Sequence, residues 1–224
     1  KTKNIVFGAI LVSIILAFFV PSATARAGAV VPILLGMVAA FGLAKNSRLA
    51  ALLVITAVQS VSIWNVGIKT AAAQNMVALS FINKEFNVDV SWSQWFLYAA
   101  PFSLIMSVIL FFVMIKLIKP ETNVIEGGKD VIRQQLDELG KLKATEIRLI
   151  VISLLLLFFW STEGRLHQFD TTTVTIFAIA LLLTPKIGVF ESWKSVEALI
   201  PWGTIIVFAV GIALGTVLLD TQGA

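Results

Sequence analysis

Long apolar runs separated by short polar stretches dominate the hydropathy pattern of the 224-residue chain. The run at 95–118 exceeds the length of about 20 residues that a helix needs to cross a bilayer. The other runs are shorter, and they cover residues 4–20, 27–44, 49–64, 72–82, 146–161, 171–185 and 200–219. None of them alternates between apolar and polar residues as the strands of a transmembrane barrel would. The pattern therefore predicts an all-α polytopic membrane protein.

The first polar interruption, at residues 20–26, predicts a turn between two helices. Pro21 lacks an N–H donor and disfavours helix at the preceding residue, while Ser22 or Thr24 can cap the helix that follows. The tip would then offer hydroxyl groups, free backbone N–H groups and the guanidinium of Arg26 to an anion. Two arrangements remain open: a re-entrant hairpin whose tip lies within the bilayer, and two ordinary spans joined by a tight outer turn.

A second interruption lies at residues 65–75. Gly67 allows the backbone to unwind, and Lys69, Thr70 and Asn75 follow it. A continuous helix would place these polar side chains in hydrocarbon, so we predict a broken transmembrane helix whose free carbonyls and helix ends can bind an ion or a substrate. The alternative is a kinked helix in which Lys69 packs into the bundle interior or extends to the membrane surface.

Charge placement connects the two interruptions. Most Lys and Arg residues can share one face, which we assign as cytoplasmic, but Arg26 and Lys69 fit neither face. Ionisable groups at bilayer depth are costly and usually mark a binding site or a water-filled path. All 13 acidic residues fall in loops or at the ends of runs, which disfavours a proton relay or a divalent-cation site. An anion site is therefore predicted.

The candidate site residues come from both interruptions. The predicted substrate-binding residues are Ser22, Ala23, Thr24, Arg26, Lys69, Thr70 and Asn75. Sodium, as a coupling ion, has candidate ligands in the neutral oxygens of Ser22, Gly67 and Asn75.

Composition narrows the function. The mean hydropathy is +0.94 and only 13% of residues are charged. The sequence has no cysteine and a single histidine, His167, so a thiolate site, a metal site or a catalytic triad is not expected. We find no acid–base pair or nucleophile–base set, and predict neither an enzyme nor an organic cofactor. A membrane enzyme acting on an anionic lipid, or a scaffold subunit, is the less favoured alternative.

The long polar stretch at 119–145 has a helical hydrophobic period after Gly127 and Gly128. The apolar positions that recur are Val131, Ile132, Leu136, Leu139 and Leu142. They predict an amphipathic helix on the inner membrane surface, acting as a strut between two bundles, with a regulatory or partner-binding role as the alternative. The chain begins without methionine and ends just after an apolar run, so we expect it to be a fragment.

Three motifs resemble the divalent anion/sodium symporter family, the citrate and dicarboxylate carriers. They are Pro21–Arg26 with Pro32, Gly67–Thr70 with Asn75, and Pro201–Thr204 with Gly211 and Gly215. The resemblance implies that Ser22, Ala23 and Thr24 take the place of a Ser-Asn-Thr signature at the tip of a re-entrant hairpin. It likewise assigns Gly67, Thr70 and Asn75 to the family's broken helix.

The resemblance also implies a fold and a division of the chain. The family has two inverted repeats, and an elevator-type transport domain moves against a dimerising scaffold. Residues 1–82 would belong to the transport domain, with the hairpin at about 4–44 and the broken helix at about 49–82. A transmembrane helix at 91–118 and a cytoplasmic linker at 119–145 would follow. Scaffold helices of the second repeat would occupy 146–198, and its transport region would start within 199–224.

The resemblance implies a secondary active transporter of di- or tricarboxylates, working by exchange or sodium-coupled symport. We expect it in the bacterial inner membrane as a homodimer, with no nucleic-acid partner. A carrier of an inorganic anion such as sulfate or arsenite is the alternative. Because Ala23 replaces the signature's Asn, we hypothesise that Arg26 and Lys69 supply the positive charge that sodium supplies elsewhere, which favours obligatory exchange.

Overall fold

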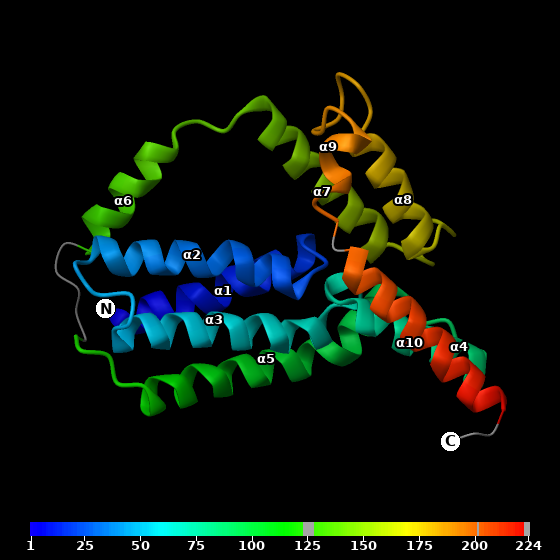
Figure 1. Cartoon of the computed structure of the whole chain (residues 1–224), viewed down its shortest axis with the longest axis horizontal. Coiled ribbons are helices and arrows are strands. Elements are labelled where there is room, and N and C mark those ends of the chain that lie inside the picture. The colour runs from blue at the N-terminus through cyan, green and yellow to red at the C-terminus, as the bar shows by residue number, and fades with distance from the viewer. Residues whose placement is uncertain (123–127, 201, 222–224) are drawn as a thin grey trace. The chain divides into compact units, whose positions relative to one another are not determined.

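A computed structural model describes residues 1–122, 128–200 and 202–221, and the regular elements within these ranges are helical. The elements are α1 (Thr2–Phe19), α2 (Ala23–Ala40), α3 (Arg48–Gly67), the short 3₁₀ helix η1 (Lys69–Ala71), α4 (Ala73–Phe86), α5 (Trp92–Leu117), α6 (Gly128–Leu139), α7 (Ala144–Ser161), α8 (Thr171–Leu182), α9 (Trp193–Glu197) and α10 (Trp202–Asp220). Five of them, α1, α2, α3, α5 and α7, are long and apolar enough to cross a membrane. This confirms the prediction of an all-α polytopic membrane protein (Figure 1).

The chain divides into two compact units, with boundaries just before α7, within α7 and at the start of α8. The first unit comprises residues 1–142 with 157–171, and the second comprises 143–156 with 172–224. Both candidate interruptions lie in the first unit. In the second unit the Arg148 guanidinium donates to the Gly188 carbonyl at 3.4 Å, which links α7 to the turn after α8.

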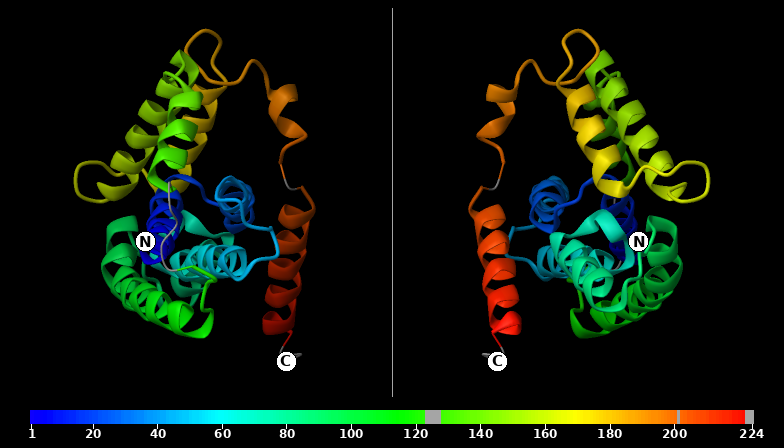
Figure 2. Two further views of the ribbon diagram at one scale, coloured as in Figure 1. Left: turned by 90° about the vertical axis from the view of Figure 1, so that its left-hand side faces the viewer. Right: turned by 90° about the vertical axis from the view of Figure 1, so that its right-hand side faces the viewer.

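The first unit is built around α3. Helices α1, α2 and α5 all pack against it, and they run side by side with it along their length (Figures 1 and 2). Leu49, Leu52 and Leu53 of α3 are completely buried, and they join side chains of the other three helices in one apolar core. Half of the α3 span is buried, against 17% of the α5 span. Helix α3 is therefore the central helix, and α5 turns most of its apolar side chains outward.

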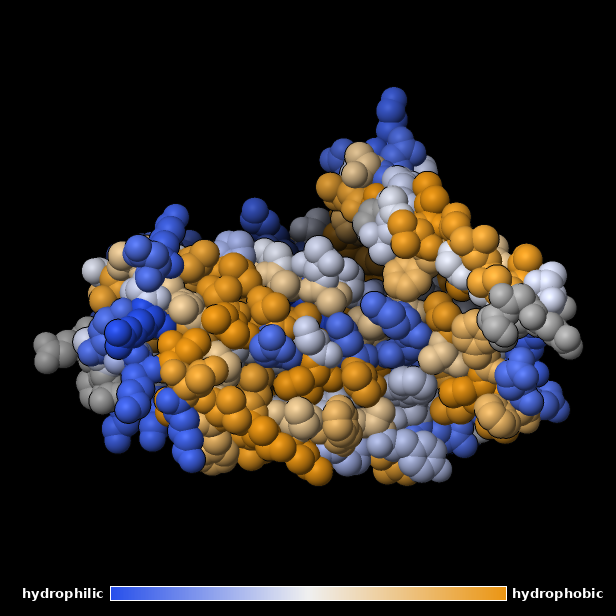
Figure 3. Space-filling view, turned by 60° about the horizontal axis from the view of Figure 1, so that its bottom comes forward, coloured by the Kyte–Doolittle hydropathy of each residue, from blue (hydrophilic) through white to orange (hydrophobic). Residues whose placement is uncertain are grey.

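The surface of the chain carries wide apolar areas, as expected for helices that face lipid rather than water (Figure 3). Hydrophilic side chains gather at the end of the bundle where α2 turns into α3 and α5 ends (Figures 1 and 3). Glu121 joins these elements, because its carboxylate accepts the backbone N–H groups of Arg48 at 2.6 Å and Leu49 at 3.1 Å. The carboxylate thus caps α3 at its positive end.

The amphipathic helix predicted in the 119–145 stretch is present as α6. Its apolar side chains Ile132, Leu136 and Leu139 are exposed, as a membrane-surface helix requires. The Gly127 break and the Val131 side chain, which were part of the same prediction, lie outside the described residues, as do Pro201 of the third family motif and the chain end at 222–224.

Candidate functional site

The first predicted interruption is the tight turn between α1 and α2. Helix α1 ends at Phe19, and Ser22 caps α2 by accepting the N–H of Ala25 at 3.2 Å. This confirms Ser22 as the helix cap. Thr24, the other candidate cap, instead lies inside the first turn of α2 and is exposed.

Arg26 extends from the first turn of α2 into the protein and is completely buried. Its Nε donates to the Ser22 carbonyl at 3.4 Å, and its Nη2 donates to the Asn65 side-chain oxygen and, at 3.0 Å, to the Ala71 carbonyl. All of these acceptors are neutral. The third guanidinium nitrogen, Nη1, is buried without a partner among the described residues. Arg26 therefore joins the hairpin tip to the second interruption and retains unused donors, which is uncommon for a buried polar group.

The second interruption separates α3 from α4. Helix α3 ends at Gly67, residues 69–71 form η1, and α4 starts at Ala73. Asn75 stabilises the break, because its Nδ2 donates to carbonyls that the helix leaves free: those of Asn65 at 2.6 Å, Ile68 at 2.9 Å and Lys69 at 3.3 Å. The side-chain amide of Asn75 thus donates its hydrogen bonds to the backbone of the break.

Gly67 provides space for a neighbouring helix, whereas the sequence had suggested that it provides backbone flexibility. Its φ is not in the positive region, so the break does not depend on a conformation that only glycine adopts easily. Instead, a Cβ at this position would meet the side chain of Ser103 on α5, at 2.7 Å from Oγ and 2.9 Å from Cβ. The glycine allows α5 to pack directly against the end of α3.

Lys69 is buried, with 6% of its surface exposed, and it has an acidic partner. Its ammonium donates to the Val90 carbonyl at 2.9 Å and lies 3.3 Å from Oε2 of Glu163. Glu163 in the α7–α8 loop therefore neutralises Lys69, whereas the sequence pattern had given Lys69 no acidic partner. The neighbouring Thr70 accepts the indole N–H of Trp92 at 3.2 Å.

The structure brings the two interruptions together and divides the predicted residues by role. Arg26 contacts Ser22 at the tip, and it also contacts Asn65 and Ala71 at the break. Ala23 is half-buried in the first turn of α2. No finding tests whether the predicted residues bind substrate, and that assignment stays a prediction.

Two residues that contact the buried cations, Asn65 and Glu163, were not among the predicted site residues. Asn65 was seen as a polar residue in the run, and its position one turn before Lys69 was the available signal. Glu163 lay in a loop, with no local signal linking it to a residue 94 positions away.

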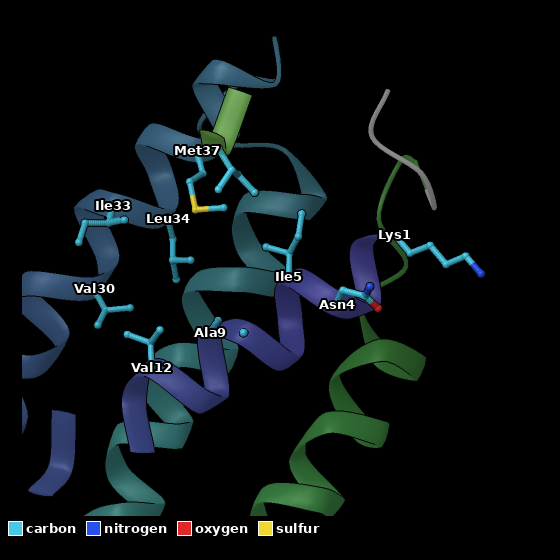
Figure 4. Close-up of a pocket in the computed structure, with 11 residues that line it drawn as sticks. Lys1, Asn4, Ile5, Ala9, Val12, Val30, Ile33, Leu34 and Met37 are labelled. Carbon is cyan, nitrogen blue, oxygen red and sulfur yellow. The ribbon is translucent and has the colours of Figure 1, made fainter. Parts of the chain in front are cut away.

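A cavity of about 400 Å³ lies elsewhere in the first unit, in a groove between α1 and α2. Apolar side chains line most of it, including Ile5, Val12, Val30 and Leu34 (Figure 4). Its lining contains no predicted site residue. Its polar lining residues are Lys1 and Asn4, while both helix interruptions lie elsewhere, so we do not place the anion site there.

Comparison with known proteins gives consistent matches along the chain. A family model described as the sodium:sulfate symporter transmembrane region matches residues 1–223. A membrane protein of Cupriavidus necator is 49% identical over 99% of the chain, which covers 43% of that relative. The putative malate transporter YflS of Bacillus subtilis is 26% identical over 97% of the chain, which covers 46% of it. The citrate/succinate antiporter of Escherichia coli K12 is 28% identical over 95% of the chain, which covers 45% of it. The chain thus spans less than half the length of these relatives.

Proposed function

Because the chain belongs to the family described as the sodium:sulfate symporter transmembrane region, we propose that it forms the anion-holding part of a secondary active transporter for small di- or tricarboxylates. The family match confirms the resemblance read from the sequence motifs. The apolar helices and the bacterial relatives make it an integral protein of the bacterial inner membrane. Relatives named for malate and for citrate and succinate support the choice of a carboxylate substrate.

One observation carries the proposal: a completely buried arginine with an unused nitrogen, at the point where two helix interruptions meet. A guanidinium in a membrane protein is costly to bury, and neutral carbonyls compensate only part of its charge. A substrate carboxylate would complete the set, because it matches the planar donors of arginine in geometry and in charge. Arg26 is therefore the proposed primary ligand of the anion, with the tip residues Ser22, Ala23 and Thr24 beside it.

The same residue favours exchange over sodium-coupled symport. The oxygens of Ser22, Asn65 and Ala71 are of the neutral kind that could surround a sodium ion, but here they accept hydrogen bonds from Arg26. The fixed charge of Arg26 would then take the role of a coupling cation. An empty site with this charge would cross a low-dielectric region poorly, and a site loaded with an anion would cross more easily. We infer obligatory exchange without a sodium requirement.

The wider architecture is part of the same proposal. The hairpin α1–α2 and the interrupted helix α3–α4 would form one copy of an inverted repeat. The relatives are more than twice as long as the chain, which leaves room for a second copy. From the family resemblance, we further propose that the transport domain moves as an elevator and that the carrier is a homodimer.

Counterflow in proteoliposomes tests the proposal. Full-length carrier is reconstituted, and uptake of labelled succinate, malate and citrate is measured with and without unlabelled succinate inside. We expect internal succinate to stimulate uptake strongly, and replacement of sodium by choline to leave it unchanged. Strong sodium dependence without stimulation from inside would refute exchange. Displacement of the label by sulfate but not by any dicarboxylate would favour an inorganic anion as the substrate.

A further inference from the structure

Glu163 connects three elements of the first unit through one carboxylate. Its Oε2 accepts the backbone N–H of Trp92 at 2.9 Å and the hydroxyl of Thr171 at 2.9 Å, and it lies 3.3 Å from the Lys69 ammonium. Its Oε1 accepts the backbone N–H of Thr171 at 3.1 Å. Trp92 and Thr171 are the first residues of α5 and α8, so the carboxylate lies at the positive ends of two helices.

Separating the Lys69–Glu163 ion pair would cost Lys69 more of its polar contacts than it would cost Glu163. Without Lys69, the Glu163 carboxylate would still accept three hydrogen bonds, two of them from helix N-terminal N–H groups. Without Glu163, the buried Lys69 ammonium would keep its hydrogen bond to the Val90 carbonyl, which carries no charge. An ammonium with only 8% of its side chain exposed does not stay in such a place without an anion. Glu163 can therefore release Lys69, but Lys69 can leave Glu163 only for another anion.

Lys69 is also next to the proposed anion site. It starts the three-residue η1, and the carbonyl of Ala71 at the end of η1 accepts the Arg26 guanidinium. The short η1 thus contains one buried cation, Lys69, which an internal carboxylate holds, and accepts a hydrogen bond from the other, Arg26, which has a free nitrogen among the described residues. A dicarboxylate carries two charged ends, and a monocarboxylate carries one.

We propose that Glu163 substitutes for one carboxylate of the substrate: it holds Lys69 while the site is empty, and a dicarboxylate bound at Arg26 takes Lys69 over with its second carboxylate. We call the Lys69–Glu163 pair the carboxylate latch. The latch rests on the proposed function and adds a basis for selectivity, because an anion with a single carboxylate satisfies Arg26 and leaves Lys69 on Glu163. It also gives Glu163 a positioning role, acting on substrate through Lys69.

Binding measurements on purified full-length carrier test the latch. The dissociation constants of succinate and of butyrate, which has the same number of carbons but one carboxylate, are measured by titration calorimetry. Glu163→Gln keeps an oxygen acceptor for the helix N–H groups and removes the competing charge. We expect Glu163→Gln to tighten succinate binding by roughly tenfold, because the variant removes a competitor that occupies Lys69 for most of the time. Butyrate binding should be unchanged.

Two further variants complete the test. Lys69→Met should weaken succinate binding by roughly tenfold or more and again leave butyrate binding unchanged. Glu191→Gln, which removes an exposed carboxylate after α8, is the matched control and should change neither constant. Should Glu163→Gln not fold, Glu163→Asp keeps the charge but withdraws it by one methylene, and it must tighten succinate binding in the same direction.

The outcomes separate the latch from the proposed function. If wild-type carrier neither binds nor exchanges any di- or tricarboxylate, the proposed function is wrong and the latch falls with it. If wild-type carrier binds succinate and Glu163→Gln does not tighten it, the latch alone is wrong. A double variant Lys69→Met/Glu163→Gln that regains the thermal stability lost by each single variant, with succinate binding unchanged in Glu163→Gln, would show a permanent structural ion pair instead.

Discussion

Replacing Arg26 by methionine separates a binding role from a structural one. The side chain donates to three neutral oxygens, those of Ser22, Asn65 and Ala71. Hydrogen bonds between membrane helices are worth about 0.6 kcal/mol each on average, so their loss would destabilise the fold by about 2 kcal/mol. Burial of a charged arginine costs about 2.5–3.5 kcal/mol at the centre of a membrane helix, which is an upper limit for Arg26 in the first turn of α2, and methionine removes this cost. The two effects nearly cancel.

We therefore expect Arg26→Met to change the free energy of unfolding by only about 1 kcal/mol in either direction. Anion affinity should respond quite differently. A hydrogen bond to a charged group contributes about 1.5–3 kcal/mol, and its loss would weaken dicarboxylate binding by roughly 10- to 100-fold. Arg26→Lys keeps the charge without the planar donors and should fall between wild type and methionine.

Two assays on the same preparations check this expectation. Thermal unfolding in detergent gives the stability change, and counterflow in proteoliposomes gives the affinity for labelled succinate. The reasoning is refuted if Arg26→Met takes up succinate with an affinity within about twofold of wild type. It is refuted equally if the variant is destabilised by more than about 3 kcal/mol, since the arginine would then be chiefly a structural link.

Two further predictions concern stability. Gly67→Ala should destabilise the fold by about 1–3 kcal/mol in thermal unfolding, because its Cβ would meet Ser103 at 2.7–2.9 Å, whereas Gly8→Ala on α1 meets nothing within 4 Å and should be neutral or slightly stabilising. Equal effects of the two alanines would contradict the close approach of α5. The backbone N–H of Arg48 lowers the pKa of Glu121 below its usual value, with further lowering from Leu49. The ionised Glu121 carboxylate therefore stabilises the fold fully above the ordinary pKa of a glutamate, and this stabilisation is lost as pH falls through the lowered pKa of the folded protein. Glu121→Gln should flatten the acid side of a plot of unfolding free energy against pH. An unchanged acid limb would show that the cap is not formed in solution.

Hydropathy was sufficient to place the main helices. The runs at 4–20 and 95–118 became α1 (Thr2–Phe19) and α5 (Trp92–Leu117), with ends shifted by one to three residues. A bilayer leaves a backbone few alternatives to helix, which makes apolar runs unusually reliable predictors. The short α9 (Trp193–Glu197) was missed, because five residues in a polar stretch show no measurable period.

The candidate site was predictable only as far as chemistry is local. Ser22 before a helix and Asn75 after a break act on backbone groups a few residues away, so the sequence pattern contained the information. Lys69 and Glu163 are 94 residues apart, and no local pattern selects one acidic residue among 13. The same limit applied to Gly67, whose partner Ser103 comes from another helix.

The difference between the two buried cations decides how the site can work. Two unpaired cations in the empty site would repel each other. In this structure Lys69 has Glu163 and Arg26 has only neutral oxygens, so one net charge remains at the junction of the two interruptions. If the proposed site is correct, one free cation and one internally neutralised cation would be tolerated in the empty site and would still present two positive groups to a substrate that competes for the second. The proposed arrangement would favour dianions over monoanions by displacement, without requiring either cation to face water.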